Sequence, residues 1–121
     1  MSANSPCIVY LAYGDMAFCD QAAFSLLTLH ARAQKNSLRT VVITDRPERF
    51  AGLADEALSI QASELKADMG RFGYVHRVKV QVLRRIAAQF PDAEGWMLID
   101  ADTIWRDAPT NLLNELDHGF F

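Results

Sequence analysis

Three short runs of apolar residues constrain the fold of this chain more than any other feature. They are Cys7 to Ala12, Thr40 to Thr44 and Trp96 to Ile99. Apolar and polar residues do not alternate within them, and such runs are typical of strands buried on both faces. The segments between the runs are long enough to hold helices, which favours parallel strands joined by right-handed crossovers. We therefore expect an α/β domain with a mainly parallel sheet and helices on both faces.

The segment after the first strand predicts a long helix. Gly14 breaks the apolar run, and either Asp15 or Asp20 is suited to cap the helix that follows. The helix is expected to end near residues 35–37, and His30 is expected at the polar edge of its apolar face. That face is predicted to contain Ala22, Ala23, Leu26, Leu27, Leu29 and His30.

Weaker patterns fill the rest of the chain. Residues 47–50 predict a helical turn after Pro47, and residues 56–60 predict a third, shorter strand. Residues 61–73 lose periodicity and contain two glycines, so we interpret the part from Asp68 to Gly73 as a mobile loop. The residues from Arg106 to Leu116 predict a turn and a short amphipathic helix.

The clearest helix runs from Tyr74 to Phe90, and it carries Lys79 at an unexpected position. At about 100° per residue, Lys79 falls within the apolar sector, near Val75 and Val82. One interpretation is that its aliphatic stem passes the core and its ammonium reaches water. The other is that this face borders a pocket, where the ammonium and the helix amino terminus would meet an anionic ligand. His76 borders the same sector and is a weaker candidate for the pocket.

Two aspartates follow the last apolar run directly. If the backbone stays extended through Asp100, Ala101 and Asp102, the period of two places both carboxylates on the same side. Neighbouring carboxylates repel each other, and a divalent ion such as Mg²⁺ or Mn²⁺ that bridges a diphosphate would supply the missing positive charge. The carboxyl end of a strand is also where open α/β sheets bind ligands. The alternative is an acidic turn in which Asp102 caps the next element.

Composition limits the class of protein. The chain has 121 residues, half of them hydrophobic, which suits one modest domain spanning residues 1–121. A net charge of −3 argues against a general binder of nucleic acid or anionic membranes. Cys7 and Cys19 lack the spacing of a zinc site and are expected to be reduced and buried. With neither a transmembrane segment nor an export signal visible, we expect a cytoplasmic protein.

The order of these features resembles the nucleotide-binding half of a GT-A-type glycosyltransferase. The resemblance rests on Tyr13-Gly14-Asp15 between the first strand and helix, on Tyr74-x-x-Arg77-x-Lys79, and on Trp96-Met-Leu-Ile-Asp-Ala-Asp-Thr-Ile-Trp105. It covers nearly the whole chain and is closest to glycogenin-like and lipopolysaccharide-glycosyltransferase-like enzymes. It implies a Rossmann-like GT-A fold and a nucleotide-diphosphate sugar as donor, with a UDP-sugar expected.

The resemblance also assigns roles to individual positions. In such enzymes the loop after the first strand holds the nucleobase, and a D-x-D motif binds Mn²⁺ or Mg²⁺ on the donor diphosphate. Asp100 and Asp102 would be the metal ligands, with Asp100 also near the ribose, and Lys79 would be the basic residue near the nucleotide. The complete set implied for nucleotide-sugar binding is Ala12, Tyr13, Gly14, His76, Lys79, Asp100, Ala101 and Asp102.

Two alternatives remain open. Family members are longer than this chain, so we expect a domain truncated on its carboxyl-terminal side, without the acceptor half and its further metal ligand; His118 is not assigned that role. Such a chain could be a non-catalytic nucleotide-binding domain, since transfer needs an acceptor site. Asp-Ala-Asp after a strand also resembles haloacid-dehalogenase-like phosphatases, whose first aspartate is a nucleophile. However, Ile104 stands where that motif has a small hydroxylic residue.

Overall fold

The computed structural model describes residues 6–33, 38–61, 63–64, 75–93 and 95–106. Within these residues a sheet of four parallel strands forms the centre, in the order β3-β2-β1-β4. An α/β domain with a parallel sheet is therefore confirmed. The strands are β1 (Cys7–Ala12), β2 (Arg39–Thr44), β3 (Glu56–Ser59) and β4 (Trp96–Ile99).

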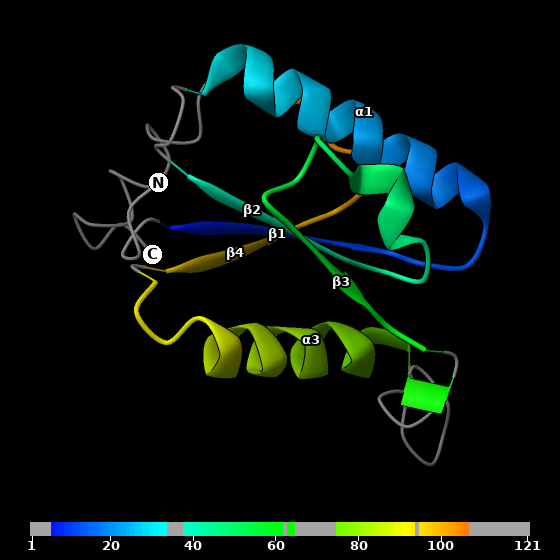
Figure 1. Ribbon diagram of the computed structural model, residues 1–121, viewed down its shortest axis with the longest axis vertical. Helices are drawn as coiled ribbons and strands as arrows, with labels where there is room; N and C mark the ends of the chain where they lie inside the picture. The colour runs from blue at the N-terminus through cyan, green and yellow to red at the C-terminus, as the bar shows by residue number, and fades with distance from the viewer. Residues whose placement is uncertain (1–5, 34–37, 62, 65–74, 94, 107–121) are drawn as a thin grey trace.

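Helices cover both faces of the sheet, as expected. Helix α1 (Met16–Arg32) lies on one face and helix α3 (Val75–Gln89) on the other (Figure 1). Because successive side chains of a strand point to opposite faces, β1 contributes to two cores. Ile8 and Tyr10 pack in the cluster beneath α1, whereas Cys7 and Val9 pack in the cluster beneath α3. All four of these side chains are fully buried, and β1 is one of the two inner strands of the described sheet.

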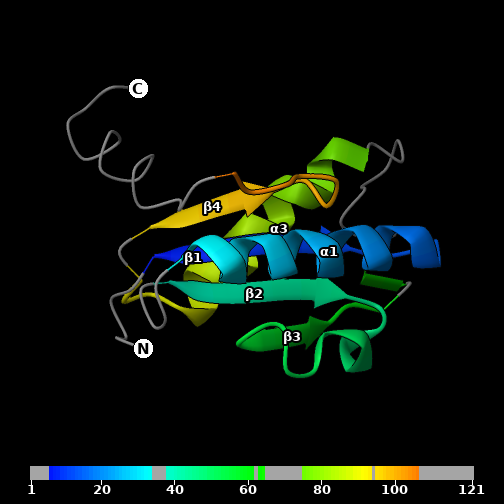
Figure 2. The same ribbon diagram turned by 90° about the horizontal axis from the view of Figure 1, so that it is seen from above.

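Strand β4 departs from the expectation that it is buried on both faces. It pairs only with β1 among the described strands, and Figure 2 shows it at the edge of the sheet. Its residues are only partly covered, and Trp96 is 40% exposed. An apolar run without alternation therefore did not distinguish a central strand from one with a single neighbour.

Helix α1 begins at a cap formed by Asp15, whose carboxylate accepts a hydrogen bond from the Ala17 amide. Asp20, the other candidate cap, instead forms an ion pair with Arg49. The helix ends at Arg32, several residues earlier than expected. Its predicted apolar face is wrong at Leu27, which is 53% exposed. His30 is also exposed, and its Nε2 hydrogen-bonds with the Leu53 carbonyl oxygen.

The short elements agree with the sequence pattern. Pro47–Phe50 forms a 3-10 turn, η1, which places Phe50 in the core, and β3 occupies most of the predicted third strand. Cys7 and Cys19 are free and buried. The expected loop from Asp68 to Gly73 and the helix expected after Arg106 lie outside the described residues. Among the described helices, none combines the length and the apolar character needed to cross a membrane.

Candidate functional site

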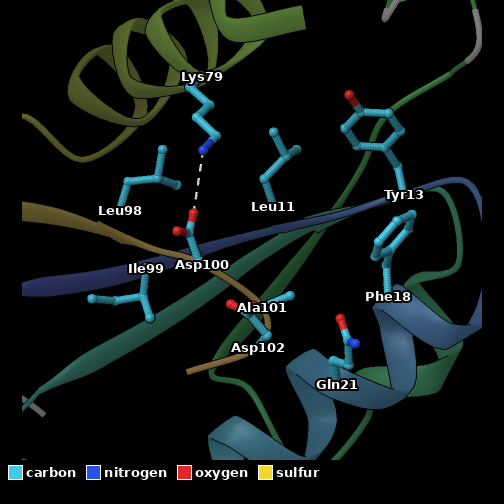
Figure 3. Close-up of a pocket in the computed structure, with 10 residues that line it drawn as sticks. All are labelled: Leu11, Tyr13, Phe18, Gln21, Lys79, Leu98, Ile99, Asp100, Ala101 and Asp102. Carbon is cyan, nitrogen blue, oxygen red and sulfur yellow. Dashed lines mark hydrogen bonds and ion pairs between the residues drawn. The ribbon is translucent and has the colours of Figure 1, made fainter. Parts of the chain in front are cut away.

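A pocket of about 430 Å³ lies at the carboxyl ends of β1 and β4. The parallel arrangement places both strand ends at one edge of the sheet, where α1 and α3 flank the opening from opposite sides (Figure 3). The pocket therefore draws on two separate regions of the sequence, residues 11–21 and residues 79–102. Its lining residues are Leu11, Tyr13, Phe18, Gln21, Lys79, Leu98, Ile99, Asp100, Ala101 and Asp102.

The two aspartates reach the pocket from a turn, not from an extended strand. Strand β4 ends at Ile99, and the Thr103 amide donates a 3.1 Å hydrogen bond to the Asp100 carbonyl oxygen. The expected extended geometry is therefore wrong. Both carboxylates nevertheless line the same pocket, as does Ala101 between them. The described ladder with β1 ends at the Tyr10–Ile99 pair, and the turn begins at the next residue, Asp100.

Lys79 enters the pocket from α3 and contacts the first aspartate. Its Nζ lies 3.2 Å from Asp100 Oδ1, within hydrogen-bonding distance (Figure 3). The side chains of Lys79 and Asp100 are 43% and 69% exposed, so water weakens this ion pair. The unexpected helical position of Lys79 thus corresponds to a pocket wall, while neighbouring Val78 and Val82 form the buried face of the helix.

The opposite wall contains two residues that sequence reasoning missed. Phe18 and Gln21 line the pocket from the first two turns of α1, and Phe18 is 50% exposed. Their spacing of three residues places them on the same side of the helix. An aromatic residue next to a helix amino terminus, directly after the loop that holds Tyr13, was the available signal. Tyr13 itself lines the pocket as expected.

The other residues assigned by resemblance have different positions. Ala12 is fully buried at the end of β1 and does not line the pocket. Gly14 also lies outside the lining: its amide donates to Asp45 Oδ2 at 3.1 Å, and its carbonyl accepts from Arg46 Nη1 at 2.6 Å. These contacts fix the backbone next to Tyr13. His76 belongs to the first turn of α3, but its side chain lies outside the described residues.

The chemistry available in the pocket combines carboxylates, an ammonium and aromatic rings. Asp100 and Asp102 offer the oxygen ligands that hard divalent cations prefer. In the part of the chain that the structure describes, no group of three or more His, Cys, Asp or Glu side chains is arranged to hold a metal. Two carboxylates leave much of the coordination sphere of Mg²⁺ or Mn²⁺ to water and ligand oxygens. This donor set fits an ion that is bound together with a phosphorylated ligand.

No protein-family model matches this chain, and a search of curated proteins finds no match to it.

Proposed function

We propose that the chain is the nucleotide-binding part of a GT-A-type glycosyltransferase, which binds a nucleotide-diphosphate sugar together with Mn²⁺ or Mg²⁺. The observation that supports the proposal most is the convergence of Asp100, Asp102, Lys79 and Tyr13 on one pocket. These residues come from the β4 turn, from α3 and from the loop after β1. A pocket with aromatic side chains and charges of both signs suits a ligand that has a base, a diphosphate and a metal ion.

Each part of the pocket would have a separate task. The side chains of Tyr13 and Phe18 provide aromatic surface for the base, and Gln21 adds an amide that both donates and accepts hydrogen bonds. The Lys79 ammonium would bind a phosphate oxygen. Asp100 and Asp102 would hold the divalent ion, which when bound neutralises charge on the diphosphate. These roles concern binding of the donor alone, and transfer of the sugar would need an acceptor site in addition.

The phosphatase alternative is less well supported. In that family a small hydroxylic residue stands two positions after the second aspartate, where this chain has Ile104. The exposed Lys79–Asp100 ion pair is compatible with either function and does not distinguish them. A non-catalytic nucleotide-binding domain would use the same pocket, and it differs from the transferase only in the acceptor contacts.

Calorimetric titration with UDP and a UDP-sugar, in Mn²⁺ and then in a chelator, tests the proposal. We expect binding that depends on the metal, and Asp102→Asn should weaken it by more than about tenfold, which is about 1.4 kcal/mol. Circular dichroism should show an unchanged fold, because the Asp102 side chain is exposed. Asp92→Asn is the matched control, since Asp92 is also exposed but lies before β4, outside the pocket.

Two outcomes would contradict the proposal at different points. Equal affinity with and without the chelator would remove the metal from the site. Failure of any nucleoside diphosphate or nucleotide sugar to bind at millimolar concentration would reject the nucleotide-binding function as a whole.

A further inference from the structure

A network of hydrogen bonds connects Trp105, which follows the Asp100–Thr103 turn, to β1 and α1. The Trp105 indole Nε1–H donates to the Tyr10 hydroxyl at 2.8 Å, and the Trp105 amide donates to Thr28 Oγ1 at 3.0 Å. The Tyr10 hydroxyl lies 2.6 Å from Ser25 Oγ, and Thr28 Oγ1 donates to the Ser25 carbonyl at 2.7 Å. We call Tyr10, Ser25, Thr28 and Trp105 the Trp105 network.

The donor groups fix the direction of one of these hydrogen bonds. An indole N–H can only donate, so the Tyr10 oxygen accepts from Trp105, whereas either hydroxyl can be the donor between Tyr10 and Ser25. Tyr10 and Ser25 are fully buried, and burial raises the pKa of the Tyr10 hydroxyl. A buried hydroxyl without a partner is costly. Trp105 donates to the hydroxyls of Tyr10 and Thr28, so the network favours the position of Trp105 in which both of these hydrogen bonds form.

Tyr10 contacts both ends of the segment from Ile99 to Trp105, which carries Asp100 and Asp102. Its backbone pairs with Ile99, the residue directly before Asp100, and its hydroxyl binds the Trp105 side chain beyond the turn. The segment between them also contains the hydrogen bond from the Thr103 amide to the Asp100 carbonyl. Tyr10 thus holds both ends of the loop that carries the two carboxylates.

Core packing alone would not require this arrangement. Trp105 packs against the cluster beneath α1, and a phenylalanine would supply similar apolar contact there. The indole and backbone hydrogen bonds add orientation, because they fix the position of Trp105 relative to both β1 and α1. Asp100 and Asp102 are exposed and carry like charges that repel each other, so an unrestrained loop would gain by separating them.

We propose that the Trp105 network is a positioning device, which holds the Asp100–Thr103 turn so that both carboxylates can bind one divalent ion together with a diphosphate. This inference rests on the proposed function. Trp105 and Tyr10 do not line the pocket, so they act through the aspartates and not on the ligand. Loss of hydrogen bonds made directly to metal ligands typically lowers metal affinity by about 10- to 100-fold. The Trp105 network instead acts through the backbone that carries the aspartates, so we expect a loss at the lower end of this range, about tenfold.

The first test compares Trp105→Phe and Tyr10→Phe with the parent chain in titrations of UDP, with Mn²⁺ and with a chelator. The gain from Mn²⁺ is the ratio of the UDP affinity in Mn²⁺ to the UDP affinity in chelator. In both variants this ratio should fall by about tenfold or more. The affinity measured in chelator should stay within about twofold, because the base contacts are unchanged. Leu38→Ala is the control: it truncates a buried side chain of the same cluster, just before β2 and four residues from Val42, the residue that pairs with Tyr10. It should keep the full gain from Mn²⁺.

Hydrogen exchange of the Thr103 amide in the ligand-free protein gives a second readout. The exchange rate should become about tenfold faster or more in both network variants, and should not change in Leu38→Ala. If Tyr10→Phe does not fold, Trp105→Phe still decides, since Trp105 is only partly buried and the substitution removes its Nε1 donor with part of the ring. An undiminished gain from Mn²⁺, or an unchanged Thr103 exchange rate, would overturn the positioning role and leave the proposed function intact. A parent chain without metal-dependent UDP binding would overturn both.

Discussion

Replacing Lys79 by methionine separates its two possible contributions, because they predict changes of opposite sign. In the structure Lys79 Nζ pairs with Asp100 Oδ1 at 3.2 Å, and both side chains are more than one-third exposed. Exposed pairs contribute only about 0–1 kcal/mol, and methionine keeps most of the aliphatic stem. The free energy of unfolding of Lys79→Met should therefore stay within about 1 kcal/mol of the parent value.

Binding should change in two directions. Without nucleotide, loss of the ammonium frees Asp100, so Mn²⁺ alone should bind Lys79→Met about 2- to 5-fold more tightly, the equivalent of about 0.5–1 kcal/mol. With a nucleoside diphosphate, loss of a hydrogen bond to a charged phosphate should cost about 1.5–3 kcal/mol, or about 10- to 150-fold in affinity. The proposal thus requires Lys79 to exchange Asp100 for a phosphate when the ligand binds.

Isothermal calorimetry with Mn²⁺ alone and with Mn²⁺ plus UDP measures both effects. Arg84→Met is the control, since Arg84 is exposed on the same helix and outside the pocket lining, and it should change neither affinity by more than about twofold. If Lys79→Met binds Mn²⁺ and UDP together as tightly as the parent, Lys79 does not reach the phosphate. The assignment would then be withdrawn, while Asp100 and Asp102 would keep theirs.

Two further predictions concern the fold that supports the pocket. Gly14→Ala should lower the free energy of unfolding, measured in urea, by about 1–2 kcal/mol, because Gly14 has a φ of +89° that strains a residue with a Cβ. Space is not the cause, since nothing lies within 4 Å of an added Cβ at Gly14 or at the control position Gly95. Gly95→Ala should be nearly neutral, and equal effects of the two substitutions would refute the backbone strain at Gly14. Burial raises the pKa values of Tyr10 and Cys7 in the folded chain, so the folded state holds their protons to higher pH than the unfolded state does. The free energy of unfolding should therefore be constant with respect to these two groups below their ordinary pKa values, and should fall as pH rises above about 8.5–10. Tyr10→Phe should show a smaller fall in unfolding free energy above about pH 10, and an identical fall would contradict the contribution of Tyr10.

Local pattern alone was sufficient for the existence of the described strands and helices and for the α/β class of the fold. Uninterrupted apolar runs identified β1, β2 and β4, and the 3.6-residue period identified α3. The same period singled out Lys79, because a charge inside an apolar sector conflicts with simple burial. These features depend on neighbours in sequence, which is why they could be predicted.

Strand neighbours and pocket geometry depended on tertiary structure. The sequence of β4 does not state that it pairs with β1 alone in the described sheet, and this pairing ends where the Asp100–Thr103 turn begins. The exposure of Leu27 and the position of Phe18 and Gln21 follow from how α1 lies on the sheet, which its own amphipathic pattern specified poorly.

The Trp105 network shows most clearly what only the folded chain decides. Trp105 and Tyr10 are 95 residues apart, and each alone would be interpreted as an apolar core residue. Their hydrogen bond exists because β1 and β4 are adjacent strands and Trp105 packs on the face of the sheet that α1 covers. By itself the sequence determined which residues carry charge and that Asp100 and Asp102 follow a strand. The tertiary structure decided which side chains meet them, since contacts across the sheet depend on strand order and helix placement, and neither is encoded in a local pattern.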